Sequence, residues 1–111
     1  MYYYILMSRE SVLEILRGYR RRFIRAYVFG SVARGEQDEY NDIDIIMVRA
    51  TELPFPERGK ELLSLLRELG GADLLIYTVD EFNRQMEIGG FVYHVVKEAI
   101  QVEGEQKGSA V

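Results

Sequence analysis

The sequence predicts an α/β sandwich in which a small sheet is covered by helices. Three short apolar runs, at residues 25–29, 42–48 and 73–78, have the length and composition of buried strands. The segments around them carry apolar residues at helical spacing. A chain of 111 residues with 48% hydrophobic residues is sufficient for one domain with an ordinary core. We therefore expect a single domain over residues 1–103, followed by a disordered tail over 104–111, which is polar and rich in small residues.

The first helix precedes the first strand. Either Ser8 or Ser11 is suited to cap it, and Ser11 with Glu14 fits a capping box. Its apolar residues recur at helical spacing and predict a buried face: Val12, Ile15, Leu16, Tyr19 and Phe23. Residues 1–7 are apolar and aromatic, and they support either an edge strand or a cover for the core.

Three further helices are predicted after the second strand. Pro54 and Pro56 exclude a helix before residue 57, and the next helix spans 57–69. Leucines supply its buried stripe: Leu62, Leu63, Leu65, Leu66 and Leu69. A third helix over 80–87 is capped by Asp80. A last helix runs from Phe91 to Ala99, with Phe91 on its apolar side, and carries the single histidine, His94, for which a surface position is expected.

The stretch that joins the first two strands carries the candidate chemistry. The first strand ends at Gly30-Ser31, and the second opens with Asp42 and Asp44. Alternate strand residues share a face, so these two carboxylates lie roughly 6.5 Å apart along the strand. A divalent cation relieves their repulsion, and oxygen ligands suit Mg²⁺ or Mn²⁺. Gly30 allows close approach of a ligand to the backbone, and free amides at a turn capped by Ser31 favour phosphate.

Each of these features alone is also compatible with ordinary structure. A Gly-Ser pair after a strand commonly forms only a turn. The carboxylates of an Asp-x-Asp at a strand start commonly lie at the solvated rim of a sheet and bind no metal. Asp73 opens a buried strand and needs either a partner or water. One window contains a strand, Gly-Ser, Arg-Gly, a spacer and Asp-x-Asp. This combination indicates a functional site much more specifically than any one of these features does.

That combination resembles the signature of the minimal nucleotidyltransferases of the DNA polymerase β-like superfamily. The matching residues are Gly30-Ser31-Val32-Ala33-Arg34-Gly35 and Asn41-Asp42-Ile43-Asp44. Asn41 stands where Ser is commonest in the family. The resemblance implies the polymerase β-like fold, with a mixed sheet that carries the site at one edge. It also implies that Asp42 and Asp44 bind two metal ions, that Asp73 is the third carboxylate, and that Gly30 and Ser31 hold the triphosphate. Arg34 either stabilises the phosphates or braces the turn.

The resemblance further implies an activity and a partner. Many minimal nucleotidyltransferases are antitoxins that transfer AMP from ATP to a tyrosine hydroxyl of a HEPN-domain toxin encoded nearby. The chain is short for an acceptor-binding domain of its own, which favours an acceptor supplied by a partner. Two alternatives stay open: a non-catalytic subunit that binds a nucleotide or a HEPN protein, and a nucleotidyltransferase that acts on a small molecule. No residue indicates ATP over another NTP, and homo-oligomerisation is also left open.

Composition narrows the classes of function. The net charge of −4 argues against non-specific nucleic-acid binding. There is no cysteine, which excludes disulfides and thiolate metal sites. No run is long and apolar enough to cross a bilayer, and the first seven residues lack the basic start of a signal peptide. We therefore expect a cytoplasmic protein without a membrane partner.

Overall fold

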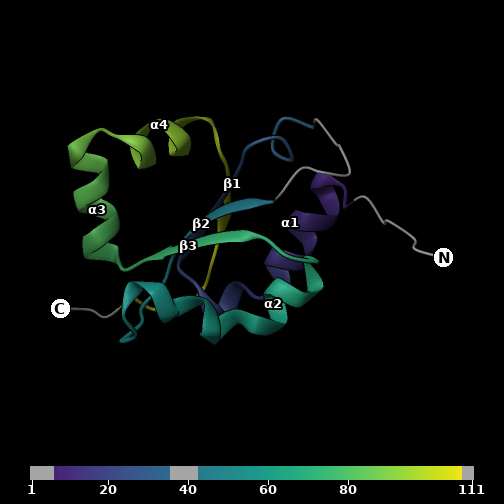
Figure 1. Cartoon of the computed structure of the whole chain (residues 1–111), viewed down its shortest axis with the longest axis horizontal. Helices are drawn as coiled ribbons and strands as arrows, with labels where there is room; N and C mark the ends of the chain where they lie inside the picture. The colour runs from purple at the N-terminus through teal and green to yellow at the C-terminus, as the bar shows by residue number, and fades with distance from the viewer. Residues whose placement is uncertain (1–6, 36–42, 109–111) are drawn as a thin grey trace.

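The computed structural model describes residues 7–35 and 43–108, which form a mixed sheet with helices on both faces (Figure 1). The strand order is β3-β2-β1-β4. The strands are β1 (Arg25–Phe29), β2 (Asp44–Val48), β3 (Asp73–Tyr77) and β4 (Ile100–Glu103). Strand β1 is antiparallel to β2 and β4, whereas β2 and β3 are parallel. The predicted α/β class and the mixed sheet are confirmed.

Strand β4 was not predicted. It is four residues long, too short for a clear period, and its alternation is limited to half-buried Ile100 and buried Val102. Its pairing with β1 joins segments about 75 positions apart in the chain, which local patterns do not reveal. The strand is therefore a product of tertiary pairing.

The expected disordered tail is wrong for residues 104–106. The amides of Gly104, Glu105 and Gln106 donate hydrogen bonds to the carbonyls of Ile24, Arg20 and Phe23, which continue the contact made by β4. A Cβ at Gly104 would lie 1.9 Å from the Phe23 carbonyl oxygen, so only glycine permits this approach. Residues 109–111 lie outside the described part of the chain.

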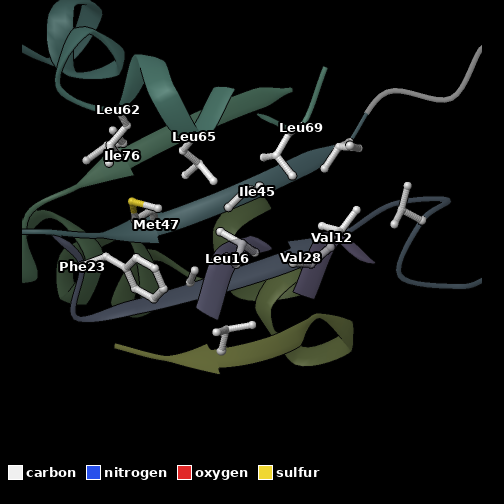
Figure 2. Close-up of a cluster of buried hydrophobic side chains, with 14 residues drawn as sticks. Val12, Leu16, Phe23, Val28, Ile45, Met47, Leu62, Leu65, Leu69 and Ile76 are labelled. Atoms are coloured by element: carbon white, nitrogen blue, oxygen red, sulfur yellow. The ribbon is translucent and has the colours of Figure 1, made fainter. Parts of the chain in front are cut away.

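One face of the sheet is covered by α1 (Arg9–Gly18) and by α2 (Leu63–Glu68) (Figures 1 and 2). Figure 2 shows their side chains pointing toward those of the central strands. The cluster is fully apolar and includes Val12, Leu16, Phe23, Val28, Ile45, Met47, Leu62, Leu65, Leu69 and Ile76. This packing holds β1 and β2 in the register that brings Phe29 opposite Asp44.

The predicted helix over 57–69 differs from the structure. Residues Phe55–Leu62 form a 3₁₀ helix, η2, which begins directly after Pro54, and α2 follows it. Because three residues per turn replace 3.6 in η2, the buried stripe shifts at the junction. Leu62 and Leu65 are buried as expected, but Leu63 is 49% exposed.

Two helices are capped by residues other than those favoured by the sequence pattern. Ser8 caps α1 and accepts a hydrogen bond from the Ser11 amide, so the Ser11–Glu14 capping box is wrong. Helix α3 (Val79–Ile88) begins one residue earlier than predicted, because Thr78 and not Asp80 is its cap. Thr78 forms a reciprocal capping box with Glu81.

The other face of the sheet is covered by α3 and α4 (Phe91–Glu98), which lie together on the left of Figure 1. Tyr27 stacks on Phe82 with ring centroids 5.4 Å apart, beside Ile46, Val48 and Val92. Side chains alternate along each strand, and Val28, Ile45 and Leu74 belong to the first face. Their neighbours Phe29, Asp44 and Asp73 are therefore on the α3–α4 face.

A buried arginine ties η2 to the edge strand and to α3. The Arg58 side chain is only 8% exposed and makes a bidentate pair with Glu81, with N–O distances of 2.6 and 3.1 Å. It also donates to the carbonyls of Leu53 and Ile76. Because this pair favours the charged carboxylate, the pKa of Glu81 is lowered to about 2.

This pKa shift predicts acid-sensitive stability. The folded pKa of Glu81 is below its ordinary value of 4.5, so its contribution is complete above pH 4.5 and is lost as the pH falls toward about 2. After allowance for solvent screening, we expect a loss of about 1–2 kcal/mol over that range. Urea unfolding at pH 6 and pH 3 measures it. In Glu81→Gln the same difference becomes smaller; an unchanged difference would contradict the role of Glu81.

Candidate active site

The turn after β1 is built on a left-handed glycine. Gly30 has φ +79°, and the Arg34 amide donates to the Gly30 carbonyl at 3.3 Å. The turn over residues 31–35 agrees with the sequence prediction. Buried Val32 anchors it in the core, and Arg9 of α1 donates to the Ala33 carbonyl at 3.4 Å. The backbone of the turn is therefore held at a defined position beside the end of β1.

Two carboxylates lie at the neighbouring strand ends. Asp44 is the first residue of β2 and Asp73 the first residue of β3, and they are register partners in the parallel pair. Adjacent strands are about 4.8 Å apart, so the two side chains lie close together on the same face of the sheet, at the ends of neighbouring strands. They line a hollow of about 410 Å³ together with Phe29, Ala72, Leu74, Leu75 and Phe91.

The glycine turn and Asp44 touch. A Cβ placed on Gly30 would lie 2.6 Å from Asp44 Oδ2, so the missing side chain is what leaves room for this carboxylate. Gly30 and Arg34 also line an adjoining hollow of about 190 Å³ that shares Phe29 and Phe91 with the first. The site therefore combines the Gly30 turn, the Arg34 side chain and the Asp44 and Asp73 carboxylates at one end of the sheet.

Gly30→Ala is expected to abolish ligand binding at this site. The substitution costs roughly 1 kcal/mol of stability from the positive φ, and the new methyl group displaces the Asp44 carboxylate. Gly70→Ala is the matched control, because Gly70 has φ +73° and a methyl group there would meet no atom within 4 Å. Thermal unfolding measures the first effect, and binding of ATP with Mg²⁺, the ligand that the sequence resemblance implies for this turn, measures the second. Equal ATP binding by the two variants would contradict the role of Gly30.

Comparison with known proteins identifies the family. The model of the polymerase beta nucleotidyltransferase domain matches residues 10–107. The chain belongs to this nucleotidyltransferase family. The family and the polymerase β-like fold predicted from the sequence are therefore confirmed. Nucleotidyltransferase domains generally use divalent metal ions.

Solved structures agree with this fold. A nucleotidyltransferase from Sulfolobus solfataricus is 22% identical, with a TM-score of 0.55 over 90% of this chain and 86% of the other. Two mutant forms of the toxin–antitoxin pair MntA–HpeT are 19% and 21% identical, with TM-scores of 0.49 and 0.48. Each of these covers 89% of this chain, and 75% and 74% of the respective other chain. Of these likenesses, the one to the Sulfolobus solfataricus protein supports the fold, and none supports more than the fold. No curated protein is similar enough to count as a relative.

The candidate site contains most of the residues singled out in the sequence. Gly30, Ser31 and Arg34 are on the turn, and Asp44 and Asp73 are on adjacent strands. Asp42 lies outside the described residues. Within residues 7–35 and 43–108, no group of three or more histidines and carboxylates is placed to hold a metal ion. The described pair, Asp44 and Asp73, offers the carboxylate oxygens that Mg²⁺ and Mn²⁺ prefer, and so fits such an ion.

Two aromatic residues of the candidate site were not recognised from the sequence. Phe29 and Phe91 line both hollows. The sequence predicted Phe91 to be on the apolar side of its helix, but it is 59% exposed and neighbouring Val92 is buried. A helical pattern does not distinguish a core aromatic from one at the mouth of a site. His94 is exposed, as expected.

Over the described residues, no helix is both long and apolar enough to cross a membrane.

Proposed function

We propose that this domain transfers AMP from ATP to a hydroxyl of a partner HEPN toxin, with tyrosine as the acceptor residue, and acts as a cytoplasmic antitoxin. The observation that carries the transfer reaction is the register pairing of Asp44 with Asp73 beside the Gly30 turn. Phosphoryl chemistry requires carboxylates for cations and amide donors for phosphate oxygens within one site. Membership of the nucleotidyltransferase family supports the same reaction class. The protein acceptor depends on the resemblance of residues 30–44 to the minimal nucleotidyltransferases.

In this proposal, Asp42, Asp44 and Asp73 would hold two divalent ions, Mg²⁺ or Mn²⁺. When bound, these ions would supply Lewis acidity at the α-phosphate and lower the pKa of the acceptor hydroxyl. Gly30 and Ser31 present backbone amides to the triphosphate, and the absent side chain at Gly30 permits close approach. Arg34 lines the adjoining hollow, where its guanidinium is suited to bind phosphate oxygens.

The proposed reaction is a direct displacement. The acceptor oxygen attacks the α-phosphorus and forms the new P–O bond. The bond to the bridging oxygen breaks, and pyrophosphate leaves with its electron pair. The hydroxyl proton passes to solvent. Because the triphosphate is the only activated group, no oxidant, reductant or further co-substrate is needed.

The decisive experiment combines the protein, Mg²⁺, ATP labelled at the α-phosphate and the protein that co-purifies with it. Label on the partner that disappears when Asp44 is replaced by asparagine supports the proposal, and mass spectrometry then assigns the modified residue. A complex that forms without label favours a binding-only antitoxin. Label on a small molecule and none on the partner favours the small-molecule enzyme. Parallel reactions with labelled GTP, CTP and UTP establish the nucleotide.

A further inference from the structure

The strongest unassigned feature is an aromatic pair at the mouth of the site. Phe29 ends β1, and Phe91 begins α4. Their ring centroids are 6.0 Å apart with an interplanar angle of 76°, an edge-to-face contact. Phe91 is nevertheless 59% exposed, so much of its ring is outside the core. A largely exposed aromatic ring therefore borders the hollow that contains the two carboxylates.

The aromatic pair borders two hollows, and each hollow is lined by both charged and apolar residues. The larger hollow is lined by Asp44 and Asp73 together with residues Ala72, Leu74 and Leu75. The smaller one combines Gly30 and Arg34 with Ala33, Val95 and Glu98. Phe29 and Phe91 border both. A nucleoside triphosphate likewise joins a charged triphosphate to a flat aromatic base, which suits charged side chains that lie beside aromatic rings.

The same linings contain few groups that could read the edge of a base. Among the described residues, no hydroxyl or amide side chain lines either hollow. The charged side chains there are two aspartates, Arg34 and Glu98. Stacking requires only a π-face, which every base has, and it therefore does not depend on which base is bound. An aromatic platform is the recognition that Phe29 and Phe91 can offer to any base.

We propose that Phe91, supported by its edge-to-face contact with Phe29, is the stacking platform for the nucleobase of the bound nucleoside triphosphate. This inference rests on the proposed function, since it assigns the base end of the same substrate. It specifies base recognition by ring area and not by hydrogen bonding. ATP and GTP bind with affinities within a few fold of each other, and both bind more tightly than CTP and UTP because purines have the larger π-face.

The test compares Phe91→Ala with Ile88→Ala. Ile88 is 65% exposed at the end of α3, lies three positions earlier and lines neither hollow, so it controls for the loss of an exposed apolar side chain. Helix α4 remains anchored by buried Val92 in both variants. Binding of ATP and of inorganic tripolyphosphate, each with Mg²⁺, is measured by calorimetry on the full chain. Loss of a stacked base weakens ATP binding by roughly 5- to 150-fold.

The expected result is specific to the base. Phe91→Ala weakens ATP binding within that range and leaves tripolyphosphate binding unchanged, Phe91→Trp restores ATP binding, and Ile88→Ala changes neither. Equal ATP affinity in Phe91→Ala and the wild type overturns the inference. The inference is also overturned if Phe91→Ala keeps its ATP affinity but has a raised KM for the partner protein. That result would assign the Phe91 ring to binding of the acceptor. If the wild type binds neither ATP nor tripolyphosphate, it is the proposed function that fails.

Discussion

Asp44→Asn lowers the rate of nucleotide transfer by about a thousandfold or more while the protein stays folded. Asp44 is the residue at which the parts of the site meet. It pairs in register with Asp73 on one side and with Phe29 on the other, and its Oδ2 fills the space that Gly30 leaves. Asparagine has the same shape but no charge, so it cannot balance a divalent cation.

The fold is expected to survive because Asp44 contributes little to the core. It is half-buried at the first position of β2, whereas Ile45, Ile46 and Met47 behind it are fully buried. Single-turnover transfer of α-labelled AMP measures the rate, and thermal unfolding checks the fold. Asp80→Asn is the control, since Asp80 is an exposed carboxylate on α3. Transfer by Asp44→Asn within twofold of the wild type would falsify the assignment.

Arg58→Met lowers the free energy of unfolding by about 2–4 kcal/mol, which for a domain of this size is a fall in Tm of roughly 10–20 °C. Within the sheet of the described residues, β3 is an edge strand, so its outward carbonyls have no strand partner there. Arg58 donates to the Ile76 carbonyl at 3.0 Å and pairs with Glu81. Methionine fills the volume but leaves that carbonyl without its donor and the partly buried Glu81 carboxylate without its cationic partner.

A nearby surface pair provides the control. Lys60 lies in the same 3₁₀ helix and pairs with Glu57, but its side chain is 70% exposed. We expect Lys60→Met to change stability by less than about 0.5 kcal/mol, since exposed ion pairs contribute little. Urea unfolding of both variants, with Glu81→Gln and the double variant, completes the cycle. If Arg58→Met and Lys60→Met were equally stable, Arg58 would have no role in holding the edge strand.

Local pattern was sufficient for most elements of the fold. Strand β1 was predicted at its observed bounds, and β2 and β3 to within two residues. The turn at Gly30 and the presence of the four α-helices were also predicted, because caps, glycines and apolar spacing act over a few residues. The departures occur where distant segments meet. The 3₁₀ helix η2 replaces the first turns of a predicted α-helix, and β4 exists only because it pairs with β1.

The same distinction applies to the site. The sequence by itself determined the motif residues, since Gly30 and Asp44 are separated by a short connection, and it determined the nucleotidyltransferase family. Only the tertiary structure decided what lies around them. The resemblance had already implied that Asp73 joins Asp44, and the parallel pairing of β2 with β3 is what places them in register. The packing of α4 on β1, which brings Phe91 to Phe29, had no counterpart in the sequence prediction. A sequence pattern specifies which face of an element is apolar, but the elements that meet at an edge are selected by the packing of the whole core.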